Sequence, residues 1–177
     1  MRITISGPPG SGKTTVAKLL AEKMGYPLLS GGMIFREMAR EMGMDLVEFS
    51  RYAELHTEVD SRIDREIVDR ARVMENVVID SRLGGWMLHK HGIPAFKVYI
   101  DASPDVRARR IMGRDGGSFE IVKREMLLRE ESERKRYLRL YGIDYEDLSI
   151  YDLVVDTDNM SPMDVLKKIL EVIGWGK

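Results

Sequence analysis

The chain contains 177 residues, 28 of them Lys or Arg and 29 Asp or Glu, which gives a formal net charge of −1. This length accommodates one α/β domain with a proper core rather than two full domains, and the near-neutral charge argues against a general nucleic-acid-binding protein. Because there is no cysteine, no leader-like N-terminus and no long apolar run, the composition excludes disulfides and thiolate zinc sites and predicts a cytoplasmic protein with no membrane partner.

A short strand, a glycine-rich loop and a helix follow one another at the N-terminus. Residues 2–6 (RITIS) have the β-branched character of a strand, and residues 14–24 place apolar side chains at helical spacing. Between them, residues 7–14 read GPPGSGKT. Such a loop can turn its backbone N–H groups around a phosphate, while Lys13 supplies positive charge and Thr14 a hydroxyl for Mg²⁺. The triphosphate site predicted here comprises Gly7, Pro8, Pro9, Gly10, Ser11, Gly12, Lys13, Thr14 and Thr15.

The next segment is predicted to be a helical insert between two strands, over about residues 31–73. Residues 27–30 (PLLS) supply a short strand, and Gly31 and Gly32 interrupt the pattern before a helix over 33–41. Two further helices are expected over 45–55 and 58–73, the first with Asp45 as its N-cap. Its apolar positions are Leu46, Val47, Phe49 and Ala53.

The remaining chain continues the alternation of strands and helices. Strands are predicted over 76–80 (NVVID), 96–100 (FKVYI) and 153–155, and helices over 103–112, over 118–141 and from 161 onward. Five strands separated by helices predict an α/β fold, a three-layer α/β/α arrangement with a five-stranded parallel sheet, in a single domain spanning 1–177. Ligands should then collect where the strands end, near the loop, Ser30, Asp80 and Asp101.

Asp80 ends an apolar strand, and from there its carboxylate can reach Mg²⁺ beside Thr14. The alternative interpretation is that Asp80 merely caps the strand. A phosphate loop requires a metal partner from a neighbouring strand, which favours the metal role. Arg82 emerges two residues later over the same edge.

Arg36 lies near the start of the helix that follows Gly31 and Gly32. From there its guanidinium could bind a second phosphate through two parallel hydrogen bonds, because the glycine pair permits a ligand to approach closely. The competing interpretation is a solvated surface arginine.

Positive charge is concentrated between residues 107 and 139, where eleven Lys and Arg face six Asp and Glu. Arg129, Glu133 and Arg136 share one helix face by their spacing. Surface pairs of Glu130 with Arg134 and of Glu131 with Lys135 could account for part of this charge. The excess is nevertheless suited to a phosphoryl group in transfer, which carries negative charge on three oxygens.

Together these motifs resemble the nucleoside monophosphate kinase family over nearly the whole chain. GPPGSGKT is similar to that family's ATP loop, residues 30–36 (SGGMIFR) to its acceptor segment and residues 110–114 (RIMGR) to the start of its lid, here about 111–128. The resemblance implies that Arg110 packs on adenine and that Arg114 reaches phosphate. It also implies transfer from ATP, with Mg²⁺, to a nucleoside monophosphate.

Within the family, the likeness is to cytidylate kinases of the archaeal type, through residues 56–64 (HTEVDSRID) and 129–136 (REESERKR). By this resemblance the catalytic residues are Lys13, Arg82, Arg114 and Arg129. The acceptor-binding residues are Ser30, Gly32, Arg36, Asp60, Asp64, Arg82, Arg129, Glu133 and Arg136.

One segment departs from the bacterial cytidylate kinases, which usually read Asp-Gly-Arg-Asp-Met-Gly where this chain has Asp-Ser-Arg-Leu-Gly at 80–84. Leu83 thus replaces an acid that helps to recognise the nucleoside, and we expect Asp60 or Asp64 to take that role. Adenylate kinases instead carry Gly-Phe-Pro-Arg there, and this difference favours CMP over AMP.

The expected activity is therefore phosphoryl transfer from ATP to CMP, with dCMP as a second acceptor. The alternatives are a kinase acting on AMP or UMP and, from another class, an ATP-dependent switch protein. A guanine-specific switch would require an Asn-Lys-x-Asp segment, which does not occur in the chain. No nucleic-acid partner and no obligate protein partner are expected.

Overall fold

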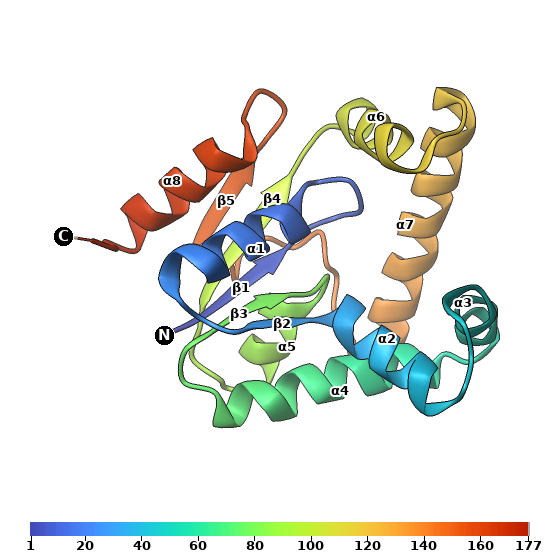
Figure 1. The fold of residues 1–177 in the computed structure, drawn as a ribbon, viewed down its shortest axis with the longest axis horizontal. Helices are drawn as coiled ribbons and strands as arrows, with labels where there is room; N and C mark the ends of the chain where they lie inside the picture. The colour runs from blue at the N-terminus through green and yellow to red at the C-terminus, as the bar shows by residue number, and fades with distance from the viewer. Residues whose placement is uncertain (177) are drawn as a thin grey trace.

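The computed structural model describes residues 1–176, without the side chains of Leu46, Val47 and Ser50. Five parallel strands form one sheet in the order β2-β3-β1-β4-β5, which confirms the predicted fold class (Figure 1). The strands are β1 (Arg2–Ser6), β2 (Leu28–Ser30), β3 (Val77–Asp80), β4 (Phe96–Asp101) and β5 (Leu153–Asp156). The helices are α1 (Lys13–Met24), α2 (Gly31–Glu41), α3 (Leu46–Leu55), α4 (Glu58–Val73), α5 (Gly84–Lys90), α6 (Pro104–Asp115), α7 (Phe119–Tyr141) and α8 (Pro162–Val172).

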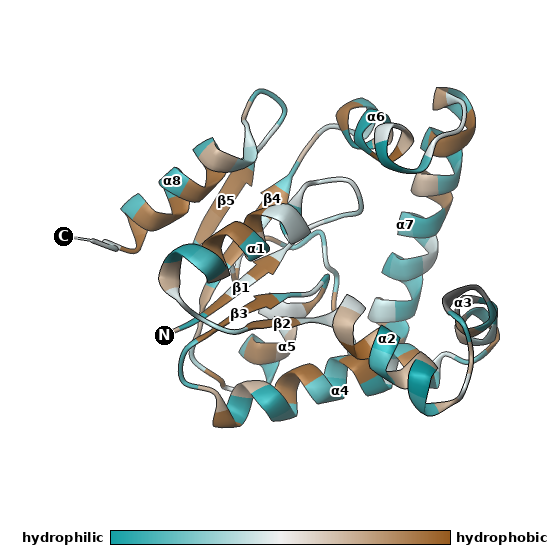
Figure 2. Ribbon diagram, viewed as in Figure 1, coloured by the Kyte–Doolittle hydropathy of each residue, from teal (hydrophilic) through white to brown (hydrophobic). Residues whose placement is uncertain are grey.

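The core is divided between the two faces of the sheet. Along β3, Val78 packs against α1 and α8, while Val77 and Ile79 pack against α2, α4 and α5, as the alternation of side chains along a strand requires. Because both faces are covered, the middle parts of the strands are largely apolar, while polar residues lie mainly at the strand ends (Figure 2). Ser30 and Asp80 are paired in register, as are Ile5 and Asp80, so the ends of β1, β2 and β3 lie side by side.

Helix α7 forms a wall beside the sheet. It runs from α6 at its N-terminal end to the helices α2 and α4 at its C-terminal end (Figure 1), where its Tyr137 packs with Val68 of α4. Its surface is mainly polar (Figure 2). The helix therefore spans the distance between the segment predicted as the lid and the segment predicted as the insert.

The structure confirms the cap of α3 and revises the start of α2. Asp45 accepts a hydrogen bond from the Glu48 backbone N–H at 2.8 Å and closes a capping box. Leu46 and Val47 lie outside the described side chains, whereas Phe49 is fully buried as expected. Helix α2 already begins at Gly31. Its N-cap is Ser30, whose hydroxyl accepts a hydrogen bond from the Met33 backbone N–H at 3.1 Å.

Helix α5 was not predicted from the sequence. It has seven residues and begins with two glycines, which is a poor local signal for a helix. Tertiary packing explains Gly85, because a Cβ there would lie 2.7 Å from the Tyr151 ring. Space is also restricted at Gly84, where a Cβ would lie 3.2 Å from the Cβ of the preceding Ser81. The Gly85 N–H donates to the Ser6 hydroxyl at 3.2 Å, so the start of α5 is anchored to the end of β1.

Within residues 1–176, none of the helices combines the length and the apolar character that a membrane crossing would need.

Candidate functional site

The glycine-rich loop joins the end of β1 at Ser6 to the start of α1 at Lys13. Gly7 and Gly10 have φ angles of 151° and 78°, which side chains rarely permit. Space is also restricted, because a Cβ at Gly7 would lie 2.1 Å from the Ile100 carbonyl oxygen and one at Gly10 would lie 2.7 Å from the Arg107 carbonyl oxygen. The loop therefore packs its backbone directly against β4 and α6.

Lys13 lies half-buried in the first turn of α1. Removal of its ammonium group from water, followed by repulsion from Arg82, lowers its pKa to about 7, although the nearby Asp80 carboxylate opposes the shift. The Asp80 carboxylate thus offsets only part of the effect of burial and of the neighbouring arginines on this ammonium group. Lys13 is therefore suited to an incoming polyphosphate.

Thr14 and Asp80 fit a metal ion that is carried by a nucleotide. Both side chains line the same cleft. Thr14 is exposed at the start of α1, and Asp80 is buried at the end of β3. In the described part of the chain, no group of three or more His, Asp or Glu could hold an ion by itself. A hydroxyl and one carboxylate match Mg²⁺ that keeps most of its ligands as water and phosphate oxygens.

A cleft of about 900 Å³ opens between the start of α1 and the helices α2, α3, α4 and α7. The structure brings all of the predicted acceptor-binding residues to its walls, together with Lys13 and Thr14. They are Ser30, Gly32, Arg36, Asp60, Asp64, Arg82, Arg129, Glu133 and Arg136. Arg36 is exposed there, and the Ser30 hydroxyl caps α2 at the same time. Their individual roles stay predictions.

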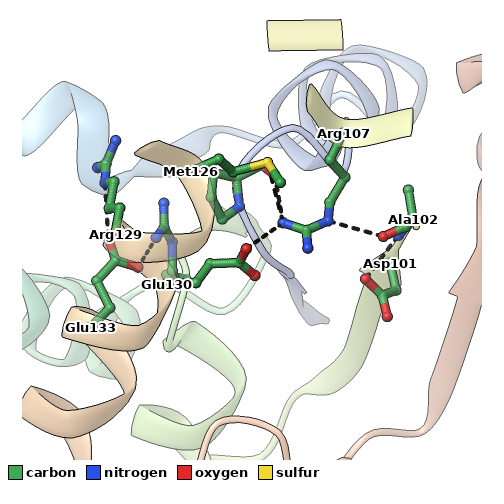
Figure 3. Close-up of polar contacts among 9 residues, drawn as sticks. Asp101, Ala102, Arg107, Met126, Arg129, Glu130 and Glu133 are labelled. Atoms are coloured by element: carbon green, nitrogen blue, oxygen red, sulfur yellow. Dashed lines mark hydrogen bonds and ion pairs between the residues drawn. The ribbon is translucent and has the colours of Figure 1, made fainter. Parts of the chain in front are cut away.

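Glu133 forms the centre of the charged wall. Its side chain is 5% exposed; one carboxylate oxygen pairs with Arg129 Nε at 3.0 Å and the other with Arg82, as Figure 3 shows for Arg129. Burial lowers the pKa of Arg82, and the nearby Arg129 charge contributes in the same direction. One carboxylate therefore holds two of the predicted catalytic arginines on the same side of the cleft.

A second polar group lies where α4 meets α7. Arg136 pairs with Asp60 at 3.6 Å, and the Tyr141 hydroxyl donates to the buried carboxylate of Asp64 at 2.8 Å. Burial raises the pKa of Asp64 to about 6, with the Asp60 charge adding to the shift and the Tyr141 hydrogen bond opposing it. The Nε atom of Arg136 is buried without a hydrogen-bond partner, which suits a ligand in the cleft.

A smaller cavity of about 420 Å³ lies on the other side of the loop. Arg110 lines it and is held in place, because its guanidinium donates to the Ser11 carbonyl at 3.1 Å and to the Thr157 carbonyl at 2.8 Å. Arg114 also lines this cavity, but its guanidinium pairs with the adjacent Asp115 at 2.6 Å and is 70% exposed. Apolar lining comes from Ile111, Val16, Met160, Pro162 and Val165.

Comparison with known proteins shows which family this chain belongs to. A sequence model of the cytidylate kinase-like family matches residues 2–159. The chain belongs to the cytidylate kinase-like family. Among curated proteins it is 52% identical to the cytidylate kinase of Methanocaldococcus jannaschii, over 89% of this chain and 88% of that protein. It is 47% identical to the cytidylate kinase of Pyrobaculum arsenaticum, over 93% of this chain and 88% of that protein.

A solved structure supports the fold independently. The shikimate kinase from Bacteroides thetaiotaomicron is similar to this chain with a TM-score of 0.68 and 15% identity, over 98% of both chains. At that identity the likeness shows the fold alone. Membership of the cytidylate kinase-like family confirms the resemblance predicted from the motifs and identifies the chain as an enzyme, a nucleoside monophosphate kinase.

Several residues of the site escaped prediction. Thr157 directly follows β5, so the rule that ligands collect at the ends of parallel strands could have found it. Tyr141 and Arg107 carry no such signal, because their partners are distant in sequence. The expected pair of Glu130 with Arg134 is wrong: Glu130 pairs with the buried Arg107 at 2.9 Å, and Arg134 with Asp144 and Glu146. The pair of Glu131 with Lys135 is confirmed, at 3.1 Å.

Proposed function

We propose that this protein transfers the γ-phosphoryl group of ATP to CMP, giving ADP and CDP, and that dCMP is a second acceptor. The observation that supports this most directly is that Lys13 and Thr14 line both the larger and the smaller cavity. A triphosphate in the loop, with its base in the smaller cavity, would present its last phosphate to the larger one. The arginine-rich wall of the larger cavity suits a second phosphate compound.

The reaction is a direct transfer. The bond between the γ-phosphorus and the β,γ-bridging oxygen breaks, and an oxygen of the CMP phosphate bonds to the same phosphorus. A phosphate monoester is largely ionised near neutral pH, so no side chain has to remove a proton. The contribution of the protein is positioning and charge neutralisation: Lys13 and the loop on the donor, and Arg82 and Arg129 between the two phosphates.

Mg²⁺, held by Thr14 and Asp80, would neutralise charge on the phosphate oxygens of the donor. Arg110 is proposed to pack on adenine and Arg114 to reach the phosphates. For Arg114 this requires the exchange of its partner Asp115 for a phosphate oxygen. We further propose that residues 31–73 and about 111–128 act as the acceptor insert and the lid, whose closure excludes water.

The choice of CMP rests on the named relatives and on the polar group at the far end of the cleft. The carboxylates of Asp60 and Asp64 and the guanidinium of Arg136 line that end of the cleft. A carboxylate can accept from the amino group of cytosine, and a guanidinium can donate to its ring nitrogen and carbonyl. Cytoplasmic location, without a nucleic-acid or obligate protein partner, completes the proposal. The lack of cysteine supports a reducing compartment.

The test is a panel of CMP, dCMP, UMP and AMP with ATP and Mg²⁺, following ADP formation. We expect the highest kcat/KM with CMP, then dCMP, and no turnover by Lys13→Ala. A preference for AMP or UMP would overturn the acceptor assignment and keep the kinase. Slow ATP hydrolysis without any phosphorylated acceptor, and no heat of CMP binding in calorimetry, would support the switch protein instead.

A further inference from the structure

Arg107 is a buried arginine at the point where the phosphate loop, β4 and α7 meet (Figure 3). The residue is 5% exposed. Its Nε donates to the Ala102 carbonyl at 2.9 Å, and one terminal nitrogen donates to the Pro9 carbonyl at 3.2 Å. The same nitrogen pairs with Glu130 of α7 at 2.9 Å. A single guanidinium thus contacts the end of a strand, the loop and the long helix.

The contact with Pro9 affects the orientation of the loop backbone. The carbonyl of Pro9 and the N–H of Gly10 belong to one planar trans peptide, in which the two groups point in opposite directions. Because the Pro9 carbonyl faces Arg107, the Gly10 N–H points away from Arg107. The carbonyl oxygen of Arg107 itself lies 2.7 Å from where a Cβ of Gly10 would be, so side chain and backbone restrict the same peptide.

The contact with Glu130 reaches the acceptor side. Glu130 and Glu133 are three residues apart and therefore neighbours on one face of α7. Glu130 pairs with Arg107, while Glu133 pairs with Arg82 and Arg129. Both carboxylates have little exposure, 14% and 5%, so removal of the arginine partner of either one would leave a buried charge unpaired. A displacement of α7 would therefore act on Arg107 through Glu130.

We propose that Arg107 is a positioning residue that links the two substrate sites. Through the Pro9 carbonyl and Glu130, it makes the phosphate-binding orientation of the loop depend on the position of α7, so that binding of ATP and of CMP favour each other. This inference rests on the proposed function, because it places the donor in the loop and the acceptor beside α7. Arg107 contacts neither substrate and acts only through the loop and the helix.

The test measures coupling rather than activity. The dissociation constant of CMP is determined by calorimetry with and without a non-hydrolysable ATP analogue, and the ratio is the coupling factor. We expect a factor of roughly 5 or more for the unmodified protein. For Glu130→Gln, which removes the charge and keeps the size, we expect it to fall to nearly 1. The matched control is Glu131→Gln, the next residue on α7, which pairs on the surface with Lys135 and should keep the original coupling.

A second variant separates positioning from simple stability. Replacing both partners, Arg107→Met with Glu130→Leu, leaves no buried unpaired charge and should preserve folding better than either single change. We expect this double variant to melt close to the unmodified protein and still to lack coupling. If it retains full coupling, or if Glu130→Gln does so, the pair is only structural and the proposal is wrong. If CMP does not bind to the unmodified protein, the proposed function fails instead, and the same ratio is measured with the acceptor that the panel identifies.

Discussion

At the scale of single residues, Lys13 has a strongly lowered pKa. Burial and the Arg82 charge lower its pKa to about 7, and the negative charge of a bound triphosphate would raise it again. At a pH between the pKa of free Lys13 and its higher pKa in the complex, Lys13 must therefore take up a proton when the triphosphate binds. Well below pH 7 the ammonium group is already charged, and no proton is needed.

The expected outcome is uptake of nearly one proton at pH 8 and little from this residue at pH 6. The measurement is calorimetric titration with the ATP analogue in buffers of different ionisation enthalpy. The slope of the binding enthalpy against the buffer's ionisation enthalpy gives the number of protons taken up. Lys13→Arg is the control, because an arginine stays charged throughout this range. Equal uptake by both proteins at pH 8 would show that the proton goes elsewhere.

The buried Asp64 gives a prediction about stability. Its pKa of about 6 in the folded protein exceeds the ordinary value of 3.8, so the folded protein binds the proton more tightly and loses stability as the pH rises from about 4 to 6. Asp64→Asn keeps an acceptor for the Tyr141 hydroxyl but has no charge to bury. We compare the unfolding free energy of Asp64→Asn with that of the unmodified protein at each pH. The difference should favour the variant by about 2 kcal/mol more at pH 8 than at pH 4.5. Urea titrations at both pH values measure this, and an equal gain would contradict the burial of the charge.

At the residue scale, the sequence predicts position where the partners are local. Strand and loop patterns place Lys13, Asp80 and Arg82 at one edge of the sheet, and the structure has all three in one cleft, while their roles stay predictions. The partners of Glu130 and Asp64 were not found, since Arg107 lies 23 positions from Glu130 and Tyr141 lies 77 positions from Asp64. Spacing along the sequence does not predict which of several carboxylates forms an ion pair with a buried arginine.

At the scale of elements, the loop depends on close packing against α6. Gly10 has φ of 78° and lies against the Arg107 carbonyl, whereas Gly25 has φ of 65° at the end of α1 with nothing within 4 Å of its Cβ position. Alanine at either site brings similar backbone strain, of about 1 kcal/mol. Only Gly10→Ala also displaces the loop.

We therefore expect Gly10→Ala to raise the KM for ATP by about tenfold or more, because a shift of about 1 Å in a positioning element has effects of this size or larger. Gly25→Ala should lose stability alone and keep its KM. Steady-state kinetics combined with melting curves distinguish the two. A similar KM for both variants would mean that the loop tolerates the contact with Arg107.

The elements themselves were largely predictable, and the exceptions have a physical cause. The strands have short apolar runs covered on both faces, and side-chain caps start α2, α3 and α8, so local pattern and final structure agree. Helix α5 has only seven residues and two glycines, and it forms because Leu88 and Met87 are buried in the core. Its existence therefore depends on tertiary contacts that local propensity does not contain.

At the scale of the whole molecule, the two cavities meet at Lys13 and Thr14, and α7 connects the helices on either side of them. A site that transfers a phosphoryl group to an acceptor must be open for binding and closed to water during transfer. The segment after α6 is suited to such a movement, since Gly116 and Gly117 both have positive φ and the neighbouring Arg114 is exposed. Closure should bring Arg114 from Asp115 onto the phosphates.

This movement predicts a change in proteolysis. Trypsin should cleave the free protein after Arg114, and a compound that joins adenosine and cytidine through a polyphosphate chain should slow this cleavage by about tenfold or more. The exposed Lys167 on α8 is the internal control, on the opposite side of the sheet from the acceptor insert. Because ligands also protect the whole chain by mass action, the ratio of the two rates is the quantity to measure. An unchanged ratio would mean that residues 111–128 do not close over the substrates, and the exclusion of water would then have to come from the acceptor insert alone.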